Sequence, residues 1–181
     1  MAERSAAVGR LPRGSVAGVW ITLMLFSFTQ RPGQTTFDTK FDLTADPGAF
    51  MARSLHLWNQ QSSFGELQNQ AYGYLFPQGL LALLGQQAGL ADWVVQRLWS
   101  GLVLIVAFEG TRRLFRALSP YAPPWVSLLA GVGYATAPRL LGLSGVLSAE
   151  VLPTAVLPWV VVPLVSAQRG RLGVRTAALL S

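Results

Sequence analysis

Three aspartates recur every four residues in the stretch FDTKFDLTADPGAF, at residues 37–50, and clustered carboxylates can take up protons or bind cations. This spacing would place Asp38, Asp42 and Asp46 on one face of a helix. However, Pro47 disfavours the helical conformation at the preceding residue, and Asp-Pro-Gly is typical of a helix that begins with an aspartate N-cap. We therefore expect Asp38 and Asp42 on an irregular loop, where either could be a catalytic base, and Asp46 at the start of the next helix.

The composition predicts a membrane protein. Of the 181 residues, 51% are hydrophobic and 12% are charged, against about 25% charged in an ordinary soluble domain. With no cysteine and one histidine, we expect neither disulfides, nor metal sites built on these residues, nor a Ser-His-Asp triad. Any need for a divalent metal stays open. The net charge of +6 could favour nucleic acid, but the basic residues lie between hydrophobic runs, so no nucleic-acid partner is predicted.

We predict an all-α, polytopic transmembrane protein with spans near residues 14–30, 93–115, 125–137 and 151–167 and a long first external loop at 31–91. The first hydrophobic run is followed by no small-x-small cleavage site, which favours an uncleaved span over a signal peptide. Because the chain ends as another hydrophobic run begins, we expect it to be the N-terminal fragment of a larger membrane protein.

The charges set the orientation of these spans in the plasma membrane. With the N-terminus inside, nine basic residues lie in the cytoplasm and five lie outside, as the positive-inside rule requires, and six of the eight acidic residues lie outside. A further span through residues 72–90 would move three arginines outside, and that segment also contains polar glutamines. The cytoplasmic basic residues are Arg4, Arg10, Arg13, Arg112, Arg113, Arg116, Arg169, Arg171 and Arg175, and the external ones are Arg31, Lys40, Arg53, Arg97 and Arg139.

The external loop is expected to contain two helices that lie in the membrane interface. Residues 46–58 gather apolar side chains on one arc and Arg53 and His56 on the other. Residues 77–90 form the second helix, and residues 62–70 form a polar linker. The alternative is that the first helix packs on a soluble subdomain.

This combination favours a membrane enzyme that acts outside the cell on a lipid-carried substrate. Asp38 or Asp42 could be the base, and Glu150 could bind the acceptor or cap a helix. The cations that could bind a lipid phosphate are Lys40, Arg97 and Arg139. The alternatives are a transporter fragment, which should place ionisable groups mid-span, and a non-catalytic membrane scaffold.

Four motifs carry a resemblance to a known family. The order of a first span, an external loop with an early acid and two interfacial helices, and further spans resembles the GT-C glycosyltransferases. More specifically, the chain from about Phe37 resembles the N-terminal part of the large α-(1→3)-arabinofuranosyltransferases of the actinobacterial cell wall. The motifs are FDTKFDLTADPGAFMARSLHLWN, AYGYLFPQG, VVQRLWSGLVLIVAFEGTRRL and GLSGVLSAEVLP.

The resemblance implies transfer of arabinofuranose from decaprenylphosphoryl arabinose to an arabinan acceptor of arabinogalactan or lipoarabinomannan. It also implies an inverting mechanism, in which an external carboxylate deprotonates the acceptor hydroxyl and Arg or Lys stabilises the departing polyprenyl phosphate. We prefer Asp38 as the base, with Asp42 second. No cofactor is implied, and the fragment alone is expected to be inactive.

The basic cytoplasmic face has two interpretations. Topology and anionic membrane lipid explain it most simply. If an acidic protein such as acyl carrier protein docks there, Arg112, Arg113 and Arg116 form the nearest cluster.

Overall fold

The computed structural model describes residues 12, 14–36, 41–60, 64–67, 72–144, 148–170 and 173–181, and these are mainly helical. In chain order the elements are α1 (Ser15–Ser27), α2 (Phe41–Ala45), α3 (Pro47–Ser54), β1 (Trp58–Asn59), β2 (Glu66–Leu67), α4 (Tyr72–Tyr74), the π-helical segment η1 (Leu75–Gly79), α5 (Leu80–Gln87), α6 (Asp92–Leu118), α7 (Pro124–Ala135), α8 (Pro138–Leu143), α9 (Ser148–Gln168) and α10 (Val174–Leu180).

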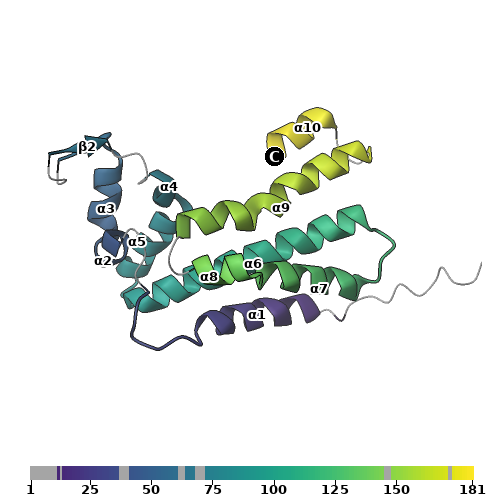
Figure 1. The fold of residues 1–181 in the computed structure, drawn as a ribbon, viewed down its shortest axis with the longest axis horizontal. Coiled ribbons are helices and arrows are strands. Elements are labelled where there is room, and N and C mark those ends of the chain that lie inside the picture. The colour runs from purple at the N-terminus through teal and green to yellow at the C-terminus, as the bar shows by residue number, and fades with distance from the viewer. Residues whose placement is uncertain are drawn as a thin grey trace, which may run out of the picture.

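Helix α6 forms the centre of a bundle, and α9, α7 and α1 pack against it (Figure 1). The short elements α2 to α5 gather at the end of the bundle where α6 begins, which we call the α2–α5 end. An apolar core joins the long helices because their leucine, valine, alanine and aromatic residues face one another. Its buried members are Leu23, Trp99, Val103, Leu104, Ala107, Phe108, Ala135, Leu140, Val151 and Ala155.

Glycines allow the helices to approach closely. A Cβ atom at Gly131 of α7 would lie 2.7 Å from Phe108 Cδ2 of α6, and a Cβ at Gly110 of α6 would lie 2.5 Å from Trp159 Nε1 of α9. Real Cβ atoms do not approach other atoms so closely. Small residues at helix contacts are typical of membrane-protein packing.

The helices match the predicted spans in position but not all in length. In the part of the chain that the structure describes, α6 and the Glu150–Gln168 portion of α9 are long and apolar enough to cross a membrane. Helix α1 has 13 residues and α7 has 12, whereas a span needs about 20. Helix α1 is therefore shorter than the predicted first span, because the chain turns after Ser27. Helix α7 matches the predicted third span to within two residues at each end, and the chain turns at Thr136 before α8. How many helices cross the membrane stays a prediction.

The loop between α1 and α6 corrects three expectations. Asp42 lies in the short helix α2 and not on an irregular loop. The helix predicted over residues 46–58 ends at Ser54. The expected polar linker contains β2, which pairs antiparallel with β1.

Local structure bears on two predictions in this loop, one at Trp58 and one at Asp46. Gly65 has a φ of +76°, which a glycine adopts without strain, and its missing side chain leaves room for the Trp58 ring. Trp58 lies in β1, where it pairs with Leu67 of β2. The prediction for Asp46 is confirmed, because its Oδ1 accepts a hydrogen bond from the Ala49 N–H at 2.9 Å and caps α3.

Candidate functional site

The segment that leads into the acidic stretch is fastened to the first turns of α6. The Thr36 N–H donates to Gln96 Oε1 at 2.7 Å, and Gln96 Nε2 donates to the Thr36 carbonyl oxygen at 2.7 Å. Next to it, Arg97 Nη2 donates to the Gln34 carbonyl oxygen at 3.0 Å. One amide side chain thus satisfies both backbone groups of Thr36, two residues before Asp38 in the sequence.

Asp42 is held by an ion pair across the α2–α3 corner. Arg53 Nη2 donates to Asp42 Oδ2 at 2.9 Å, and the two side chains are 30% and 51% exposed respectively. A pair this exposed contributes only about 0.2–1 kcal/mol to stability, because water screens both charges. It therefore orients the Asp42 carboxylate more than it stabilises the fold.

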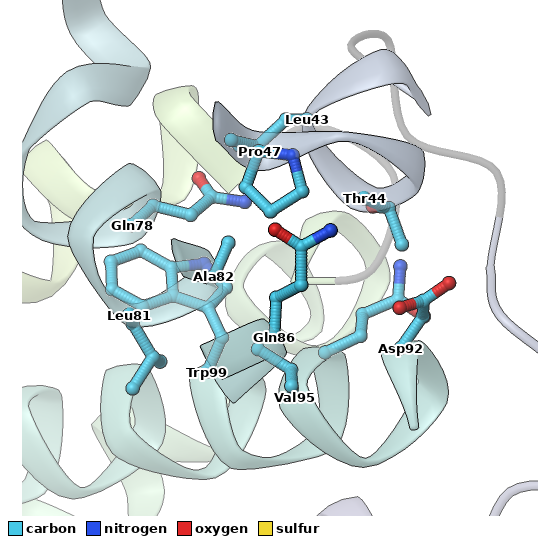
Figure 2. A pocket seen from close by; sticks show the side chains of 11 residues that line it. Leu43, Thr44, Pro47, Gln78, Leu81, Ala82, Gln86, Asp92, Val95 and Trp99 are labelled. Carbon is cyan, nitrogen blue, oxygen red and sulfur yellow. The ribbon is translucent and has the colours of Figure 1, made fainter. Parts of the chain in front are cut away.

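A pocket lies at the α2–α5 end, between α2, α3, η1, α5 and the start of α6 (Figure 2). Its empty volume is about 530 Å³, part of which is open to solvent. The apolar lining is Leu43, Pro47, Leu81, Ala82, Val95 and Trp99, and the polar lining is Thr44, Gln78, Gln86, Asp92 and Gln96. Small-molecule sites typically combine apolar walls with a few such polar groups.

Several polar groups in this pocket have no hydrogen-bond partner among the described residues. The Trp99 side chain is 6% exposed, and its Nε1–H has no hydrogen-bond partner in the described part of the chain. Within the same ranges, the Gln78, Gln86 and Asp92 side chains also make no hydrogen bond. In Figure 2, Gln86 extends from α5 towards Pro47 and Thr44, across the middle of the pocket. The pocket thus offers an indole donor, two primary amides and a carboxylate to a hydroxylated ligand.

The predicted site residues are not all brought together. Asp38 and Lys40 lie outside the described residues. Arg97 is 3% exposed and contacts the segment at Gln34 and Thr36. Arg139 of α8 and Glu150 of α9 are exposed.

The pocket residues Gln78, Gln86, Asp92, Gln96 and Trp99 were not predicted. Residues 72–90 contain three glutamines, which argued against a span there, and two of them, Gln78 and Gln86, line the pocket. Glutamines in an otherwise apolar segment were the signal that could have pointed to these two residues. Among the described residues, no three histidine, aspartate or glutamate side chains gather to hold a metal ion.

A second charged cluster lies on α6, farther from the pocket. Arg112 donates to Glu109 from Nε at 2.8 Å and from Nη2 at 2.6 Å, and Arg113 Nε donates to the same carboxylate at 2.7 Å. The Arg113 guanidinium also lies 4.6 Å from the centre of the Trp159 ring. Glu109 is buried at 6% exposure, so the two cations offset the cost of placing its charge there.

These features place the chain in a class of protein, the mainly helical bundles of membrane-protein type, here with an amide-lined pocket at one end. Within that class, the family described as "Alpha-(1->3)-arabinofuranosyltransferase, N-terminal GT-C domain" matches residues 22–181, and the chain belongs to this family.

Curated relatives are similar over most of the chain. It is 46% identical over 158 residues to an alpha-(1->3)-arabinofuranosyltransferase of Mycolicibacterium smegmatis, a match that covers 87% of this chain. It is 44% identical over 156 residues to the enzyme of the same name from Mycobacterium tuberculosis, covering 86%. In each case the matched region is 11% of the relative, so this chain spans about a ninth of their length.

The fold is also similar to solved structures. The cryo-EM structure of arabinofuranosyltransferase AftD from Mycobacteria superposes with a TM-score of 0.83 at 40% identity, covering 96% of this chain and 13% of that one. A mutant form of the same protein gives 0.84 at 42% identity, covering 94% and 14%.

Proposed function

We propose that this chain is the N-terminal part of a membrane glycosyltransferase that moves arabinofuranose from decaprenylphosphoryl arabinose to cell-wall arabinan, in arabinogalactan or lipoarabinomannan, outside the plasma membrane. The observation that carries the proposal is the family match across residues 22–181, which includes the acidic stretch and the pocket. The fragment alone is proposed to be inactive, because it spans about a ninth of its relatives.

In the proposed reaction, a carboxylate of the acidic stretch accepts the proton of the acceptor hydroxyl. The hydroxyl oxygen forms the new bond to the anomeric carbon as the bond from that carbon to the phosphate oxygen breaks, which inverts the configuration. Asp38 is the preferred base. Asp42 is second, because Arg53 already binds one of its oxygens. General-base catalysis of this kind contributes about 10²–10⁴-fold to the rate.

The departing polyprenyl phosphate needs cations near it. Lys40 and Arg139 are proposed to supply direct contacts, and exposed Arg139 is free to turn towards a lipid phosphate. Arg97 is buried beneath the segment it binds, so its proposed contribution is to hold that segment in place. Glu150 is proposed to contact the acceptor.

Asp38→Asn in the full-length enzyme tests the proposal. The asparagine keeps the size of the side chain but removes the proton acceptor, so transfer from decaprenylphosphoryl arabinose to a synthetic arabinan oligosaccharide should fall by about 10²–10⁴-fold. Donor binding should change little. If only Asp42→Asn abolishes transfer, the base is Asp42. If both variants keep normal turnover, the acidic stretch is not catalytic and the mechanism fails.

At the basic cytoplasmic face, the proposal favours anionic lipid over a dedicated acidic protein such as acyl carrier protein. Arg112 and Arg113 both bind Glu109, which leaves Arg116 with no ion-pair partner among the described residues. The test is co-purification of an acidic protein with the full-length enzyme. Its loss in Arg113→Gln and Arg116→Gln variants would favour the dedicated partner.

A further inference from the structure

We infer that the pocket at the α2–α5 end binds a neutral sugar ring. One oxygen of the sugar accepts a hydrogen bond from the Trp99 Nε1–H, and its hydroxyl groups form hydrogen bonds with the side-chain amides of Gln78 and Gln86. The inference rests on the proposed function in one respect: it assigns this sugar to the acceptor glycan and not to the lipid phosphate donor.

The first support is the Trp99 indole. Its Nε1–H is buried and has no partner among the described residues, and leaving a buried donor unpaired is unfavourable. Such groups in native proteins usually bind water or a ligand. In Figure 2 the indole nitrogen lies on the side of the ring nearer Ala82 and Gln86, and so faces the pocket. A hydroxyl or ring oxygen placed there would satisfy it.

The second support is the kind of polar group in the lining. A primary amide donates and accepts, and a carboxylate accepts, so Gln78, Gln86 and Asp92 can each bind hydroxyl groups. These side chains form no hydrogen bond to another described residue, and Gln86 and Asp92 are exposed, so a sugar would displace water from them but break no contact with a described residue.

The third support is charge. Among the described residues that line the pocket, Asp92 is charged and none is lysine or arginine. A phosphate would meet a like charge and no counter-charge, which disfavours it. A neutral sugar carries no charge that Asp92 would repel, so the lining favours it over a phosphate.

The test uses the full-length protein in nanodiscs and a synthetic, neutral arabinofuranoside oligosaccharide as the probe. Trp99→Phe keeps an aromatic ring and removes only the N–H, and Gln86→Leu keeps the side-chain size and removes the amide. Calorimetry should show that each variant weakens binding by about threefold to tenfold, the effect of one hydrogen bond. The KM for the acceptor should rise by a similar factor, while the KM for the donor should not change.

Gln87→Leu is the matched control, since Gln87 is exposed on the same helix and does not line the pocket. It should bind the oligosaccharide as the wild type does. Thermal unfolding checks that each variant folds, and Trp99→Phe breaks no hydrogen bond to another described residue.

Three results would overturn the inference. The first is that the wild type does not bind the oligosaccharide. The second is that both pocket variants bind it as well as the wild type does, as expected if the pocket holds only water, and the third is that the variants raise the KM for the donor instead of the acceptor. If the variants weaken binding but the wild type transfers no sugar, the inference stands and the proposed function fails. If transfer is normal and acceptor KM is unchanged in both variants, the inference fails and the proposed function stands.

Discussion

Gln96→Leu should release the segment that precedes the acidic stretch. The leucine is similar in size but removes both 2.7 Å hydrogen bonds to the Thr36 backbone. Each is worth about 1 kcal/mol net, so the loss of about 2 kcal/mol would shift the balance between held and released Thr36 by roughly 30-fold. If Asp38 is the base, kcat should fall by up to this factor, while the KM for the donor should change little.

A graded series separates this effect from general damage. Gln96→Glu can still accept the Thr36 N–H but has no donor for the Thr36 carbonyl oxygen, so its kcat should lie between those of the wild type and Gln96→Leu. Amide hydrogen exchange of Thr36 in the full-length protein should speed up in the same order as kcat falls. Gln87→Leu should leave both unchanged. The reasoning is refuted if Gln96→Leu keeps wild-type exchange at Thr36 and wild-type kcat.

Three further predictions concern packing, capping and topology. Gly131→Ala should destabilise the bundle by about 1–3 kcal/mol through overpacking against α6, whereas Gly133→Ala meets open space and should be neutral or stabilising; equal melting temperatures would contradict this. Asp46→Ala should cost about 1 kcal/mol by thermal unfolding and Asp46→Asn far less, because asparagine also caps helices; equal losses would argue against the cap. With single cysteines at Ser63 and Ser119, an impermeant thiol reagent should label only the first in intact cells; labelling of only the second would reverse the topology.

Sequence reasoning found the features that depend on near neighbours. Asp46 caps α3 because its partner Ala49 is three residues away, and the apolar runs form α6 and α9 because lipid or protein surroundings favour helices that satisfy their own backbone groups. It failed at Trp58, which the helical pattern placed in a helix but which pairs with Leu67 of β2, nine residues further along the chain.

The sequence by itself determined a helical membrane protein with an acidic stretch near its first helix, because hydrophobic length and charge asymmetry are properties of the chain alone. Only the tertiary structure decided that Gln96 binds Thr36, 60 residues away, and that the Trp99 N–H, which has no partner among the described residues, lies on the side of its ring nearer Gln86. These placements depend on the angle at which α5 and the α1–α2 connection meet α6. A hydrogen bond forms only within a few tenths of an ångström of its ideal length, and no periodicity in the sequence specifies that placement.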